Sequence, residues 1–180
     1  MLDQEAGQSP LWMFVLIAAA ILFSFALACG MPFAALSALA ALTLAPRNAI
    51  VLGGLGWLAN QMIGFGFLGY PLDAMTLAWG IALGVSAIAA VGAGLIMVRR
   101  SALTSLPLRL GTAFLAAWIA QQATIFVASL LLGGTATAFA VDVVWFIFWT
   151  NALAFIVLLA AQYVGARFGL AHSPIAQGVV

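Results

Sequence analysis

Long apolar stretches, separated by short breaks rich in glycine, proline or charge, divide the chain into six segments. We predict helices at about 11–29, 33–44, 49–68, 74–98, 110–132 and 141–166. Most of these segments approach the roughly 20 residues that an α-helix needs to cross a membrane. Segment 33–44 is short for a crossing, so we expect a thin, tilted or partly recessed helix there. The pattern predicts an all-α integral membrane bundle of six transmembrane helices.

The positions of the basic residues predict how this bundle is oriented. With both ends of the chain in the cytoplasm, all five arginines fall in cytoplasmic segments, namely Arg47, Arg99, Arg100, Arg109 and Arg167. The outer loops contain no arginine and hold Asp73 and Asp142. Such an asymmetry is typical of membrane proteins, and removing one helix would split the arginines between the two sides. The polar, acidic start lacks the basic region of a signal peptide, so we expect the first helix to be retained.

The composition supports a membrane protein and excludes several other classes. Hydrophobic residues make up 67% of the 180 residues and charged residues only 5%, against about 25% charged in a typical soluble domain. We therefore expect one transmembrane domain, residues 1–180, in the plasma (inner) membrane of a bacterium, with lipid as its solvent. Five scattered arginines form no basic patch, which argues against nucleic acid as a partner.

Few residues could carry catalysis. The chain has one cysteine, Cys29, and one histidine, His172, so it can form no internal disulfide or thiol metal cluster. No predicted span contains a histidine or lysine, and there is no phosphate-binding loop. We expect a protein that is not an enzyme and has no cofactor, and a small membrane enzyme is the weakest alternative.

Several amide side chains fall at membrane depth, where an unpaired polar group is costly. They are Asn60, Gln61, Gln121, Gln122 and Asn151. Each could bond a neighbouring helix or bind a neutral polar ligand. We take Asn60 and Gln121 as candidates for ligand binding, and the sequence leaves the role of Asn151 open.

Aromatic and acidic residues gather toward the predicted outer side. Asp142, Trp145 and Trp149 are three and four residues apart and therefore share a helix face. Trp79 lies near the outer end of the predicted helix 74–98, and Tyr70 and Asp73 come just before that helix. These residues suit either an interfacial aromatic belt or a pocket for a flat or cationic ring, through stacking and cation–π attraction.

Small residues recur every four positions along several segments, which lets helices approach closely. On the first helix they are Ala20, Ser24 and Ala28, a face for packing within the chain or for docking another membrane subunit. Next to it, Cys29 precedes Met31. A lone thiol is usually a small buried apolar group, and its alternative here is a soft ligand to the cobalt of a corrinoid.

Segment 34–69 resembles the substrate-binding (S) components of energy-coupling factor transporters, which capture vitamins. The resemblance rests on Leu-Thr-Leu-Ala-Pro-Arg at 42–47 and on the glycine-rich run 53–64, which contains Asn60-Gln61. The family often has glycine where this chain has Ala45. The resemblance implies that the face of Ala20, Ser24 and Ala28 docks a coupling protein associated with ATPases. It also implies an outer pocket under the loops at Met31 and at 69–73, near Trp79, Asp142, Trp145 and Trp149.

This resemblance implies a high-affinity binding subunit for a vitamin or related micronutrient, working with an ATP-driven coupling complex or alone. A thiamine-like cationic ring suits the stripe of tryptophans and carboxylate, whereas a cobalamin-like corrinoid suits Cys29. The competing hypothesis is a non-catalytic structural or assembly subunit of a larger membrane complex, in which the amides are interhelical contacts and the tryptophans an interfacial belt.

Overall fold

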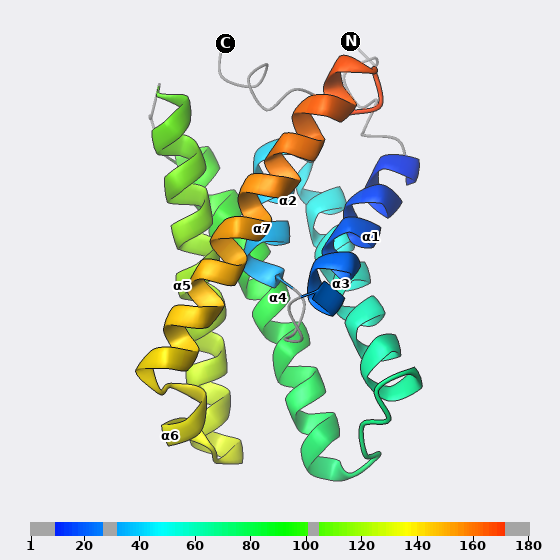
Figure 1. Ribbon diagram of the computed structural model, residues 1–180. Coiled ribbons are helices and arrows are strands. Elements are labelled where there is room, and N and C mark those ends of the chain that lie inside the picture. The colour runs from blue at the N-terminus through cyan, green and yellow to red at the C-terminus, as the bar shows by residue number, and fades with distance from the viewer. Residues whose placement is uncertain (1–9, 27–31, 101–104, 172–180) are drawn as a thin grey trace.

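The computed structural model describes residues 10–26, 32–100 and 105–171, and these residues form a helical bundle (Figure 1). The elements in chain order are α1 (Pro10–Ala26), α2 (Phe33–Thr43), α3 (Pro46–Gly66), α4 (Ala74–Arg100), α5 (Leu106–Leu132), α6 (Thr135–Ala138) and α7 (Val141–Arg167). The all-α class predicted from the sequence is confirmed for this part of the chain.

Four helices, α3, α4, α5 and α7, are long and apolar enough to cross a membrane, which gives the chain the build of a multi-pass membrane protein. Of the six predicted crossings, these four correspond to helices with the length and apolar composition that a crossing requires. With 17 and 11 residues, α1 and α2 reach about 25 and 16 Å at the rise of an α-helix, against a hydrocarbon core of about 30 Å. In Figure 1, α1 begins at the end of the bundle where α3 also begins and ends near mid-height, and α2 returns from mid-height to the same end.

Every residue of α2 is buried. This alanine-rich helix lies among α4, α5, α3 and α7, and an evenly apolar helix belongs inside a protein or a membrane. Small residues on α4 make room for it, since a Cβ added at Gly94 would lie 2.9 Å from the Cβ of Ala41. Ser86, Ala90 and Gly94, spaced four apart, are all buried. The small-residue faces of α2 and α4 therefore serve packing within the chain.

Two helices begin earlier than the sequence analysis predicted. Pro46 and Pro107 were expected to break the chain, yet each lies in the first turn of a helix, α3 and α5. Proline is tolerated there because the first backbone N–H groups of a helix have no partner within it. The loop predicted after α5 also contains the single turn α6, where the Thr135 hydroxyl donates to the Ser129 carbonyl at 3.0 Å.

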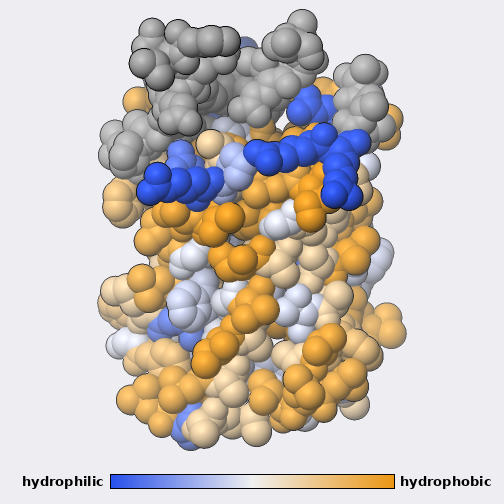
Figure 2. Space-filling view, turned by 180° about the vertical axis from the view of Figure 1, so that it is seen from behind, coloured by the Kyte–Doolittle hydropathy of each residue, from blue (hydrophilic) through white to orange (hydrophobic). Residues whose placement is uncertain are grey.

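All five arginines lie at one end of the bundle. Helices α3 and α5 begin at this end, and α4 and α7 finish at it (Figure 1). We call it the arginine end and the opposite end, which carries Asp73 and Asp142, the arginine-free end. From behind, Figure 2 shows strongly hydrophilic surface concentrated toward the arginine end and mostly hydrophobic surface over the rest of the bundle. The charge asymmetry read from the sequence is therefore present in the fold.

Candidate functional site

Helices α5 and α7 meet through a cluster of six aromatic rings. On α7, Trp145 stacks on Phe148 with centroids 6.2 Å apart, and Trp149 meets both edge-on at 5.5 and 5.7 Å. Phe148 then contacts the α5 rings of Trp118 at 5.2 Å and Phe114 at 5.9 Å. Phe114 stacks on Phe155 of α7 at 5.3 Å. We call these six residues the aromatic cluster.

The aromatic cluster leads from the surface of the protein into its core. Trp145 and Trp149 are 60% and 54% exposed, whereas Phe114 and Phe155 are each 7% exposed. Between them, Trp118 and Phe148 are half-buried. A ring that stacks on the exposed tryptophans therefore has a continuous aromatic path inward.

Two polar atoms on α5, one of them in the half-buried middle of the cluster, have no hydrogen-bond partner. They are Trp118 Nε1, a donor, and Gln121 Oε1, an acceptor, and both are shielded from solvent. The Gln121 side chain is only 7% exposed. An unsatisfied buried polar group costs about 1–3 kcal/mol, and lipid chains cannot satisfy it. Such atoms are rare in native structures, where a ligand, an ion or an ordered water usually satisfies them.

In contrast, the Asn151 side chain forms hydrogen bonds through both its oxygen and its nitrogen, and those of the oxygen are to α2. Its Oδ1 accepts hydrogen bonds from the backbone N–H groups of Ala34 at 3.1 Å and Ala35 at 3.3 Å. Its Nδ2 donates to the carbonyl of Ile147 at 3.0 Å. The residue before α2, Pro32, makes no side-chain cap, so a residue of α7 caps this buried helix instead. This assigns Asn151, whose role the sequence left open, to structure.

The amides on α3 pack against α4. Asn60 Nδ2 donates to Gln61 Oε1 at 3.4 Å, and the Gln61 amide lies where a Cβ on Gly80 would be. One turn earlier, Trp57 Nε1 donates to the Gly80 carbonyl at 2.8 Å. Asn60, a predicted ligand-binding residue, is thus bonded to its neighbour Gln61 on α3, whereas the aromatic cluster is formed by α5 and α7.

The remaining predicted residues at the arginine-free end fall into two groups. Tyr70, Asp73 and Trp79 belong to the α3–α4 hairpin, and Asp142, Trp145 and Trp149 belong to α7, on the other side of the bundle in Figure 1. Ring contacts among the described residues join Tyr70 to Phe65, at 6.2 Å, and not to the tryptophans of α7.

The two carboxylates at this end differ in their surroundings. Asp73 Oδ1 accepts the backbone N–H of Thr76 at 2.8 Å, at the start of α4, and this hydrogen bond lowers the pKa of the Asp73 carboxyl. Asp142 is exposed in the first turn of α7, where a negative charge interacts favourably with the helix dipole. Asp142 therefore remains available near Trp145, whereas Asp73 acts as a helix cap.

Several predicted residues cannot be compared with the structure. Ala20 and Ser24 lie on α1, but their side chains are outside the described part, and Ala28, Cys29 and Met31 lie outside the described residues altogether. Among the residues that are described, no group of three or more His, Cys, Asp or Glu residues could hold a metal ion.

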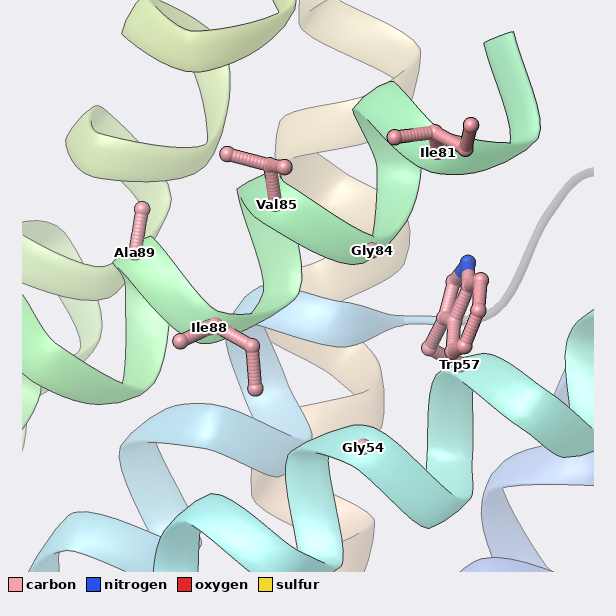
Figure 3. Close-up of a pocket in the computed structure, with 7 residues that line it drawn as sticks. All are labelled: Gly54, Trp57, Ile81, Gly84, Val85, Ile88 and Ala89. Atoms are coloured by element: carbon pink, nitrogen blue, oxygen red, sulfur yellow. The ribbon is translucent and has the colours of Figure 1, made fainter. Parts of the chain in front are cut away.

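A groove of about 660 Å³ lies between α3 and α4 (Figure 3). Within this groove the Trp57 ring of α3 lies against Gly84 of α4, and Ile81, Val85 and Ile88 line the α4 side. These three side chains are 64%, 55% and 41% exposed, so they lie open to lipid. Its one polar side-chain atom, Trp57 Nε1, is already bonded to Gly80. A ligand site usually offers converging polar groups, and their lack makes this groove a weaker candidate than the aromatic cluster.

Gln121 was predicted from the sequence, whereas Trp118, Phe148, Phe114 and Phe155 were not. A spacing signal was present, since Trp118 precedes Gln121 by three residues and Phe148 lies between Trp145 and Trp149. Residues three or four apart share a helix face, so the two faces could have been recognised. That they face each other across α5 and α7 required the structure.

Comparisons with protein-family models, curated proteins and solved structures find no match to this chain.

Proposed function

We propose that the chain is a membrane-embedded, high-affinity binding subunit for a vitamin or related micronutrient. The ligand enters from the arginine-free end, which is the outer side when the arginine end faces the cytoplasm. Its flat ring stacks against the aromatic cluster between α5 and α7. A thiamine-like ring or a cobalamin-like corrinoid remains the proposed type of ligand, and the chain itself carries out no catalysis.

The observation that carries this proposal is the aromatic cluster itself. It joins two largely exposed tryptophans, Trp145 and Trp149, to buried rings in the core. Aromatic rings bind flat ligands by stacking and attract cations at their faces, and the Asp142 carboxylate is exposed one turn before Trp145. Neither the α3–α4 groove nor the packed amides of α3 offer this combination.

Uptake against a concentration gradient needs an energy source, and the sequence offers no phosphate-binding loop for ATP. In the proposal, the chain works as energy-coupling factor S components do, with an ATP-driven coupling complex, or else acts alone as a facilitator in a bacterial inner membrane. The resemblance of segment 34–69 to that family supports the first mode. The docking face would be Ala20, Ser24 and Ala28. Replacing Ala20 or Ser24 with leucine should then abolish capture of the coupling protein while ligand binding survives.

Mass spectrometry of the small molecules that co-purify with the detergent-solubilised protein tests the proposal. We expect a stoichiometric heteroaromatic compound with wild type and its loss from the double variant Trp145→Leu/Trp149→Leu, which should stay folded because both residues are exposed. Phe168→Leu is a matched control, since Phe168 is 76% exposed at the other end of the chain's last helix. No compound in wild type, and no thermal stabilisation by a panel of vitamins, would contradict the proposal.

One observation favours a second function, that of a structural subunit in a larger membrane complex. The exposure of Trp145 and Trp149 also suits an interfacial belt or a contact with another protein. Under this alternative, the tryptophan variants would lose a protein partner and no small molecule. The same purification, analysed for both proteins and small molecules, separates the two functions.

A further inference from the structure

Trp118 lies in the half-buried middle of the aromatic cluster, and Gln121 lies one turn further along α5. The first residue offers a hydrogen-bond donor and the second an acceptor. They are three residues apart on α5 and therefore share a face, near the middle of a 27-residue helix. Both Trp118 Nε1 and Gln121 Oε1 are shielded from solvent without a partner. Because the two atoms are not bonded to each other either, a group that accepts from the indole and donates to the amide oxygen would satisfy both.

The surroundings of this pair select a neutral group. On α5 the one charged residue is Arg109, twelve positions before Gln121. The helices around it carry charge only near their ends, at Arg99 and Arg100 on α4 and at Asp142 and Arg167 on α7, while α2 has none. A charged group placed among these helices at mid-depth would lack a counter-charge, which is costly.

The rings beside the pair define the shape of the group. Trp118 contacts Phe148 edge-on at 5.2 Å, and Phe148 stacks on Trp145, which is 60% exposed. Both polar atoms are shielded from solvent in the structure, so a ligand reaches them only when the side chains around them move. A flat heterocycle can stack on these aromatic rings and so replace the contacts that the rings make with one another.

We propose that Trp118 Nε1 and Gln121 Oε1 form the polar recognition pair of the binding site, and that the ligand presents to them a neutral acceptor–donor edge. A primary amide, a lactam or an amino-substituted ring nitrogen on a flat heterocycle has this edge. The inference rests on the proposed function and adds to it the chemical class of the group that is recognised.

Three compounds that share one ring test this inference directly. Nicotinamide carries both acceptor and donor, N,N-dimethylnicotinamide keeps the acceptor but lacks the donor, and nicotinate is charged. Binding is measured by equilibrium dialysis of the full chain in lipid nanodiscs, up to the solubility of each compound. We expect nicotinamide to bind about tenfold more tightly than the dimethyl compound, the effect of one unpaired buried acceptor, and nicotinate to bind still more weakly.

Gln121→Met removes the acceptor while keeping the length of the side chain. This variant should lose about tenfold in nicotinamide affinity and should no longer distinguish nicotinamide from its dimethyl derivative. Gln122→Met makes the same change on the neighbouring residue, which points about 100° away, and should behave like wild type. Without any added compound, Gln121→Met should be at least as stable as wild type, because it removes an unsatisfied buried atom.

Each contrary result overturns the inference. Lower stability of Gln121→Met without compound would show that Gln121 already serves the protein's own packing. Equal binding of the two amides, or no binding of nicotinamide, would show that Trp118 and Gln121 do not recognise a neutral acceptor–donor edge. Unchanged nicotinamide affinity in Gln121→Met would show that the pair holds a buried water only. If a co-purified compound is lost from Trp145→Leu/Trp149→Leu but kept by Gln121→Met, the proposed function stands and the recognition pair is wrong.

Discussion

Two tryptophan–glutamine couples lie inside this bundle and are used in opposite ways. In the first, Trp12 Nε1 of α1 donates to Gln162 Oε1 of α7 at 2.7 Å, and both side chains are buried. In the second, Trp118 and Gln121 lie on one face of α5, and neither Trp118 Nε1 nor Gln121 Oε1 has a partner. The chemistry of the side chains is the same, and only their placement differs.

The comparison shows what a polar residue at membrane depth can mean. A donor and an acceptor on facing helices satisfy each other and fasten the helices together, as Trp12 and Gln162 fasten α1 to α7. A donor and an acceptor on the same helix face, one turn apart, both point outward and need a third group. The two couples therefore differ in their need for an outside partner, although their residue types are the same.

The largest loss of stability is expected on replacing Asn151, the residue of α7 that caps α2. In Asn151→Leu, the backbone N–H groups of Ala34 and Ala35 lose their acceptor inside the bundle. We expect a loss of about 2–5 kcal/mol in the free energy of unfolding, from two unsatisfied buried donors. Thermal unfolding in detergent measures it, and Leu153→Ala, at a site 51% exposed on the same helix, should change little. An Asn151→Leu variant as stable as wild type would refute the capping role.

The next effect compares the two couples directly. Gln162→Met leaves the buried Nε1 of Trp12 without this acceptor, so we expect a loss of about 1–3 kcal/mol in unfolding free energy. Gln121→Met, the same substitution in the unpaired couple, should cause no loss. Denaturant or thermal unfolding of the two variants side by side measures the difference. Equal losses would mean that the two couples do not differ in the way described.

A smaller effect is expected at the α3–α4 interface, where the polar atom of Trp57 is also paired. A Cβ on Gly84 would lie 2.9 Å from the Trp57 ring, and such overpacking typically costs about 1–3 kcal/mol. Alanine recovers up to about 1 kcal/mol by its better helix propensity, so Gly84→Ala should lose about 1 kcal/mol net.

Gly92 supplies the control for this substitution, because nothing lies within 4 Å of a Cβ added there. Gly92→Ala should be neutral or slightly stabilising in the same unfolding measurement. If Gly84→Ala were also stabilising, the Trp57 ring would be shown to move aside at little cost. The hydrogen bond from Trp57 to Gly80 would then not hold the ring rigidly against α4.

The features that the sequence could predict are those carried by single segments. Apolar runs identified the long helices, and the positions of the arginines predicted that all five would share one end. The identity of Gln121 as an unusual residue also followed from its depth within an apolar run. Each of these inferences needs only the residues within one helix or their order along the chain.

What the sequence could not predict depends on which helices meet. The short apolar run of α2 predicts a thin, tilted or partly recessed helix, and its complete burial is visible only once α4, α5 and α7 surround it. Asn151 lies 117 residues from Ala34 in the chain, so its capping role has no local signal. A single tryptophan at position 118 gives no local sign of its partner, and its contact with Phe148 of α7 is visible only in the structure.

The smallest expected effect concerns Asp73. Its carboxylate accepts a backbone hydrogen bond, whereas Asp142 is exposed. The hydrogen bond from the Thr76 backbone N–H lowers the pKa of Asp73 below its ordinary value of 3.8. The charged form is thus favoured by folding, and the stability it contributes is fully present above pH 3.8. That contribution is lost as the pH falls through the lowered pKa of the folded state.

Asp73→Asn isolates this contribution, because asparagine also caps helices but does not ionise in this range. The difference in melting temperature between wild type and Asp73→Asn should be small and constant above pH 3.8 and should shrink as the pH falls further. Asp73→Ala, which removes the cap, should be less stable than Asp73→Asn at every pH. A difference that persists unchanged in acid would mean that the Asp73 charge is not used in capping α4, and would return this carboxylate to the candidates for ligand binding.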